Sequence, residues 1–205
     1  AYANLPFAFH TIGSSMAARA SAYCEQGGMN RRKAGEDFYF LQKFIDVGTL
    51  TELKTTMVIP SPRPSHRVPF GTGRAIQEML DEEREITKSY AFDCFEMLKD
   101  CFQDVRQFYS SSAGANELLL AFVGHQEWEE KLSEIRSQST SLERFEKRFF
   151  RWFNAFQTLK FIHFLRDNCF LNKPLETEVP KLLEKLEIKK PWKGLLEELR
   201  QLDRT

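Results

Sequence analysis

The spacing of the hydrophobic residues predicts two helices in the front part of the chain. The first covers residues 14–26 and ends at Gly27 and Gly28, because glycine readily adopts the left-handed conformation that ends helices. The second covers residues 35–47, where apolar side chains recur at helical steps. A β-branched run over residues 55–59 is the one strand that we predict. The front of the chain therefore has a mixed pattern.

Helical spacing dominates the rest of the chain. One helix is predicted over residues 74–109 and a second from the cap Asn116 to about residue 137. The motif Thr-Ser-Leu-Glu at 140–143 is typical of a capping box, so we expect a long helix from there to about residue 169. Two short helices follow Pro180 and Pro191, since proline is tolerated in a first helical turn.

The phenylalanines decide the fold class. The chain has 19 of them, and over residues 145–164 they cover more than one helix face, which requires a packed helical core. We therefore predict a mainly α protein with a small α+β front part. The shift in pattern gives two regions, 1–75 and 76–205. Because no flexible linker marks their border, we expect the two regions to pack together.

Charge and composition narrow the function classes. Lysine plus arginine equals aspartate plus glutamate, 29 against 29, so the net charge gives no general attraction for nucleic acid or an anionic membrane. A hydrophobic fraction of 42% without a long apolar run indicates a soluble protein that is not transmembrane. The four cysteines form no Cys-x-x-Cys pair, which favours reduced, buried thiols. We expect a cytoplasmic protein, and a peripheral site on the inner face of a membrane stays open.

The run Gly35-Glu36-Asp37-Phe38 places two acids in the first turn of a predicted helix. Taken alone, these acids have a structural explanation, because carboxylates near a helix N-terminus complement the helix dipole and cap free amides. The segments before them change the interpretation. The small-residue segment 13–19, then Tyr23, then the Gly-Gly turn at 27–30 precede the acids in a characteristic order.

In order and spacing, residues 10 to about 75 resemble the second half of family 2 glycosyltransferases of the GT-A fold. The resemblance implies a truncated GT-A second half over residues 1–75, followed by a helical bundle that resembles no family pattern. It also implies that Asp37 is the general base and that its neighbour Glu36 orients it or binds acceptor hydroxyls. A solvated or capping role for Glu36 stays open.

The chemistry that the resemblance implies explains these residue types. A sugar hydroxyl is a poor nucleophile, so a carboxylate within hydrogen-bond reach must take its proton as it attacks the anomeric carbon. The expected function is transfer of a sugar from a nucleotide-sugar donor to a hydroxyl acceptor. If the carboxylate only removes the proton, a single in-line displacement inverts the anomeric carbon.

A basic loop over residues 61–73 is the candidate site for the leaving diphosphate, which needs cationic partners. Prolines stiffen this loop and glycines end it, so that its cations and amides can converge on phosphate oxygens; a solvated loop is the structural alternative. The candidate diphosphate-binding residues are Arg63, Arg67, Gly71, Gly73 and Arg74.

Four histidines complete the candidate chemistry. By the resemblance, His66 is the candidate third ligand of a divalent metal, Mg or Mn, in the full-length enzyme. His10 stands at the end of a possible strand, where its side chain would face the acceptor pocket; a structural histidine is the alternative. His125 and His163 have no carboxylate at ligand spacing on their helices, so we interpret both as structural.

The donor-binding half of a GT-A enzyme is not recognisable in this sequence. The chain contains no Asp-x-Asp motif, and it begins without an initiator methionine or a secretory signal. We therefore expect a C-terminal fragment that is inactive alone. The alternative function is a helical protein-interaction or oligomerisation module without catalysis, in which residues 80–205 dock a partner or a second copy and the acids only cap a helix. A patch of exposed phenylalanine would favour this alternative.

Overall fold

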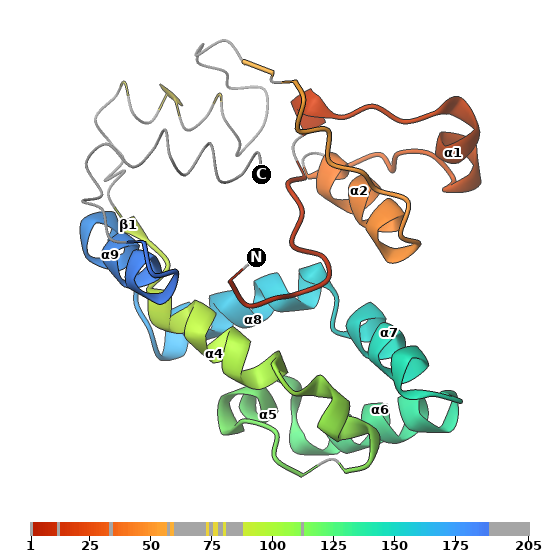
Figure 1. The fold of residues 1–205 in the computed structure, drawn as a ribbon, viewed down its shortest axis with the longest axis vertical. Helices are drawn as coiled ribbons and strands as arrows, with labels where there is room; N and C mark the ends of the chain where they lie inside the picture. Colours follow the sequence, from red (N-terminus) through yellow and green to blue (C-terminus); the bar gives the residue numbers. More distant parts are fainter. Residues whose placement is uncertain are drawn as a thin grey trace. The chain divides into compact units, whose positions relative to one another are not determined.

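The computed structural model divides the chain into two compact units (Figure 1). Unit 1 comprises Ala1–Ala8 and Lys88–Lys190, and unit 2 comprises Phe9–Thr87 and Pro191–Thr205. The residues that the structure describes are 2–11, 13–32, 35–56, 58–59, 73, 76–77, 80, 88–111 and 113–188. None of the helices within these ranges is long and apolar enough to cross a membrane.

Unit 1 is helical, which confirms a mainly α protein. Its elements are β1 (Lys88–Ser89), α4 (Phe92–Phe102), the 3₁₀ helix η2 (Val105–Tyr109), α5 (Glu117–Val123), α6 (His125–Ser137), α7 (Leu142–Trp152), α8 (Ala155–Asn168), β2 (Lys173–Pro174) and α9 (Leu175–Lys185). The strands pair antiparallel, with Lys88 opposite Pro174 and Ser89 opposite Lys173. α4 packs against α8 and α9, and α6 packs against α7 (Figure 1).

The long helices predicted for this unit are interrupted, and residues at the breaks explain why. The helix expected over 116–137 is divided into α5 and α6 by Gly124, whose φ of 94° is incompatible with a continuous helix. The helix expected from the capping box at 140–143 to about residue 169 is divided into α7 and α8. The side chain of Asn154 accepts hydrogen bonds from the amides of Phe156 and Gln157 and so starts a new helix.

The helix predicted over 74–109 is also wrong as one element. β1 and an extended Ala91 precede α4, and Gln103 and Asp104 separate α4 from η2. The predicted start of the last helix in this unit is wrong as well, because α9 begins at Leu175 and contains Pro180. The helix predicted after Pro191 lies outside the described residues.

Two predicted caps have different outcomes. Asn116 caps α5 as predicted, since its side chain accepts from the amide of Leu118. The cap of α7 is Ser141, which accepts from the amide of Arg144; the predicted capping box started one residue earlier, at Thr140. The shift makes Leu142 the first residue of the helix.

The core of unit 1 is built from aromatic rings around α7, as the phenylalanine pattern predicts. Phe149 has no exposed surface. Its ring centroid lies 5.4–6.2 Å from those of Phe102, Phe108, Trp128, Phe145, Phe150 and Trp152. Such pairs contribute beyond the area that they bury, so this ring joins four elements of the unit.

A buried carboxylate ties α9 to α4. Glu178, only 4% exposed, accepts from the amide of Phe92 at 2.6 Å, from the hydroxyl of Thr177 at 3.1 Å, and pairs with Lys181 at 3.0 Å. Burial by itself would raise the pKa of Glu178, but the amide, the ammonium and the hydroxyl together lower it. The start of α4 therefore depends on a residue far along the chain.

Unit 2 contains the 3₁₀ helix η1 (Gly13–Ser15), α1 (Ala20–Glu25) and α2 (Glu36–Asp46) in its described residues. α2 confirms the second predicted helix. α1 is shorter than the first predicted helix, because Arg19 is extended. The strand predicted over 55–59 is wrong for its described residues. Thr55 lies in a turn, and Val58 and Ile59 are 53% and 79% exposed and pair with no strand of the described part of the chain.

Replacing the central ring of unit 1 should be severely destabilising. Phe149→Ala leaves a cavity among six aromatic neighbours, so we expect the free energy of unfolding to fall by about 3–5 kcal/mol. The control is Phe156→Ala on α8, where the ring is 37% exposed and a loss below about 1 kcal/mol is expected. Urea denaturation followed by circular dichroism measures both; equal losses would contradict the central role of Phe149.

The Glu178 network should make unfolding depend on pH. Because its folded pKa is lowered, Glu178 stabilises the fold above the ordinary pKa of 4.5, and this stabilisation is lost as the pH falls through the folded value. Glu178→Gln should therefore be less stable than the parent protein near neutral pH and converge with it in acid. Urea denaturation over a pH series tests this. Glu176→Gln, an exposed acid on the same helix, is the control, and a difference for Glu178→Gln that does not change with pH would refute the linkage.

Candidate functional site

The two predicted acids lie in the first turn of α2. Gly35 precedes them as the N-cap with φ 73° and ψ 13°, a left-handed conformation that suits glycine. Glu36 and Asp37 follow, both half-buried, at the end of the helix where the dipole favours negative charge. The motif thus begins a helix as its sequence predicts.

The carboxylate of Asp37 is fixed by two backbone amides. Oδ2 accepts from the amide of Gly13 at 3.0 Å, and Oδ1 accepts from the amide of Phe38 at 2.8 Å. A Cβ atom on Gly13 would lie 2.6 Å from Oδ2, so only glycine allows this approach. Because a carboxylate offers about four lone-pair positions, these two bonds orient Asp37 and leave positions for a further donor such as a hydroxyl.

The Gly-Gly turn is attached to the same helix. Gly27 and Gly28 have φ values of 67° and 68°, as a left-handed helix end requires. The ammonium of Lys43, on α2, donates to the carbonyls of Gln26 and Gly28, each at 2.9 Å. The turn after α1 is therefore joined to α2 by a charged residue.

Aromatic contacts reinforce this arrangement. The ring of Tyr23 on α1 lies 5.4 Å from that of buried Phe40 on α2. Arg32, in the segment between the two helices, stacks its guanidinium 3.7 Å from the ring centroid of Tyr39. Three parts of the chain that carry the resemblance thus contact α2: Gly13, Tyr23 and the Gly-Gly turn.

The other predicted site residues are not placed beside Asp37 by any contact among the described residues. His10 lies in an irregular segment, not at a strand end as expected, and its side chain is 73% exposed with Nδ1 3.6 Å from Oε1 of Glu52. Gly73 is helical. The remaining predicted residues of the basic loop, Arg63, His66, Arg67, Gly71 and Arg74, lie outside the described residues.

The described residues do not form a metal centre. No group of three or more histidine, cysteine, aspartate or glutamate side chains is placed to hold an ion in the part of the chain that the structure describes.

Cysteine and histidine side chains of unit 1 have structural surroundings. Cys94 and Cys101 are buried on α4, and burial raises the pKa of their thiols to about 11 and about 12, which keeps them protonated. The expectation of buried thiols is wrong for Cys24 and Cys169, which are exposed. His163 confirms a structural interpretation, because its Nε2 lies 2.9 Å from the hydroxyl of Tyr90.

Two residues to which the sequence assigns no role position the candidate site: Gly13 holds the carboxylate of Asp37, and Lys43 holds the Gly-Gly turn. Gly13 has a role only through its contact with a side chain 24 residues away. Lys43 stands seven residues after Glu36, in the last turn of α2, where a cation is expected for the helix dipole alone. The sequence signals these roles only in that Gly13 lies in, and Lys43 lies just after, a segment that carries the resemblance.

Comparison with known proteins adds no relative. The chain matches no protein-family model, and neither a curated protein nor a solved structure has significant similarity to it.

The contact between Gly13 and Asp37 should produce strong energetic coupling. Gly13→Ala alone forces the carboxylate away and should cost about 1–3 kcal/mol of unfolding free energy. An Asp37→Gly background removes the Oδ2, Cβ and Cγ atoms that the added Cβ would meet at 2.6, 2.8 and 3.1 Å. We therefore expect the double variant to lose less than the sum of the two single losses, by at least about 0.5 kcal/mol. A double-mutant cycle from urea denaturation measures this.

Gly27→Ala provides the matched control for this cycle. Its added Cβ would meet nothing within 4 Å, although the positive φ makes the substitution strained. Its loss of about 1–2 kcal/mol should therefore add to that of Asp37→Gly without coupling. Additive losses for Gly13→Ala would contradict the contact.

Proposed function

We propose that this chain supplies the acceptor side of an inverting glycosyltransferase that uses a nucleotide-sugar donor, with Asp37 as the general base. The proposal is supported above all by the contacts that Gly13, Tyr23 and the Gly-Gly turn, which carry the resemblance, make with α2. A carboxylate held by two amides, with acceptor positions left over, meets the geometric requirement for taking a proton from a bound hydroxyl.

The proposed reaction is one displacement. The acceptor hydroxyl oxygen attacks the anomeric carbon while its proton passes to a carboxylate oxygen of Asp37. The bond between the anomeric carbon and the phosphate oxygen breaks, and the nucleoside diphosphate leaves from the opposite face with the bonding electron pair. Gly13 acts as a positioning residue, because its amide fixes the direction of the carboxylate.

The leaving diphosphate requires positive charge or donors where its own charge develops. In this proposal the arginines and glycine amides of the basic loop, together with Gly73 and Arg74, supply them. His66 is proposed as a ligand of Mg or Mn together with the donor-binding half, and Glu36 as an acceptor contact. The steps assigned to Asp37 do not depend on the metal.

The alternative, a helical interaction module, gains no specific support from unit 1. Most of its phenylalanines are buried in the core or packed partly buried against it. The exposed ones among the described residues are Phe156 in unit 1 and Phe9 in unit 2. These do not form a phenylalanine patch on one unit. Self-association through the helical region stays a prediction, as does a cytoplasmic or peripheral membrane location.

Removing the proposed base should abolish turnover and leave donor binding intact. Asp37→Asn keeps the shape of the side chain but only one acceptor oxygen for the two amides, and it is a much weaker base, so we expect kcat to fall by about 10²- to 10⁴-fold. The measurement is sugar transfer in a protein that joins this chain to its donor-binding half, with nucleotide-sugar affinity determined in parallel and expected to change less than about three-fold.

Asp46→Asn is the matched control, because it makes the same change at the exposed far end of α2. It should leave turnover and donor affinity unchanged. Retained turnover in Asp37→Asn would refute the assignment of the base.

A further inference from the structure

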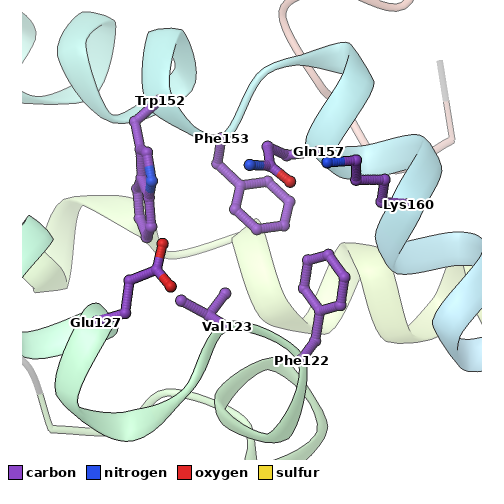
Figure 2. Close-up of a pocket in the computed structure, with 7 residues that line it drawn as sticks. All are labelled: Phe122, Val123, Glu127, Trp152, Phe153, Gln157 and Lys160. Carbon is purple, nitrogen blue, oxygen red and sulfur yellow. The ribbon is translucent and has the colours of Figure 1, made fainter.

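The two helix breaks of unit 1 lie at one pocket of about 190 Å³ (Figure 2). Phe122 and Val123 end α5 just before Gly124, while Trp152 and Phe153 end α7 just before Asn154. The next helices contribute Glu127 from α6 and Gln157 and Lys160 from α8. The chain thus interrupts two helices where it forms a hollow.

The walls of this pocket are aromatic and held in place. Trp152 lies 5.8 Å from Trp128 and 5.6 Å from Phe149, ring to ring. Phe122 lies 5.2 Å from Phe161, which is fully buried. Walls anchored in the core do not need to be ordered when a ligand binds, which lowers the entropic cost of binding.

The polar groups at the pocket differ in what they offer. Figure 2 shows Glu127 and Lys160 on opposite sides of the pocket and Gln157 between Phe153 and Lys160. The ammonium of Lys160 also lies 4.5 Å from the ring centroid of Phe156, its neighbour on α8. The carboxylate only accepts hydrogen bonds, the ammonium only donates, and the amide does both. One charge of each sign lines the pocket, so its net charge attracts neither a simple cation nor a simple anion.

We propose that this pocket binds one neutral sugar ring. A sugar has a C–H face that packs on aromatic rings, whose faces carry negative charge density, and neighbouring hydroxyls that each donate and accept. This chemistry complements the ring of Trp152 together with Glu127, Gln157 and Lys160, while Phe153 forms the buried floor of the pocket. The volume lies below the roughly 300–1,000 Å³ of pockets for drug-sized ligands, which agrees with a single ring.

The saccharide pocket is independent of the proposed base. Asp37 belongs to unit 2, and every residue that lines the pocket belongs to unit 1. The pocket would hold a sugar unit of a saccharide whether or not the chain contributes to sugar transfer. Binding by Asp37→Asn should equal that of the parent chain, which separates a failure of this inference from a failure of the proposed function.

The experiment titrates the full chain with methyl glycosides of glucose, galactose, mannose and N-acetylglucosamine. Saturation-transfer NMR detects binding, and tryptophan fluorescence reports on the pocket. At least one glycoside should bind with a Kd on the order of 1 mM, as expected for a ligand of this size. Trp152→Phe should remove the fluorescence change.

Two variants test the polar contacts. Lys160→Met and Gln157→Leu should each weaken binding about five-fold, the effect of one ordinary hydrogen bond. Lys147→Met, an exposed lysine of α7 outside the pocket, is the matched control and should bind like the parent chain. Circular dichroism verifies that each variant is folded.

Three results would overturn the proposal. One is that no glycoside binds at a concentration of about ten times the expected Kd. Another is binding that Trp152→Phe, Lys160→Met and Gln157→Leu all leave unchanged, which places the sugar elsewhere. The last is binding of phenylalanine as a free zwitterion in preference to every glycoside, since Glu127 and Lys160 would then recognise opposite charges and not hydroxyls.

Discussion

The burial of aromatic rings around α7 is the constraint on which unit 1 depends. Phe149 contacts rings from α4, η2 and α6 as well as its own helix, so the positions of these elements follow from one side chain. Large flat rings restrict one another more than aliphatic chains do, because their preferred contacts are edge-to-face or offset. The same rings extend to Trp152 and Phe153, so the rigidity of the pocket is a consequence of the core.

The sequence was sufficient where structure is decided locally. α2 lies within the predicted bounds, Gly27 and Gly28 have positive φ, and Asn116 caps its helix. These features depend on neighbouring residues, and their patterns are visible in a short window. The acids at the start of α2 were found for the same reason.

Predictions failed where the start of a helix or a contact depends on a residue far away in the sequence. α4 begins at Phe92 because Glu178, 86 residues later, accepts its amide hydrogen bond. The breaks at Gly124 and Asn154 were missed because hydrophobic spacing continues through both, and a single glycine is tolerated in a helical pattern. For the candidate site, the place of Asp37 in the first turn of a helix was predictable. Its contact with Gly13 was not, since nothing in a single sequence pairs residues 24 positions apart.

The distribution of the thiols has a practical consequence. Cys94 and Cys101 are buried with raised pKa values, whereas Cys24 and Cys169 are exposed, one in unit 2 and one in unit 1. A thiol-reactive dye will therefore label one position on each unit without any engineered cysteine. The native chain carries its own pair of probe sites, and energy transfer between them reports how the two units are arranged in solution.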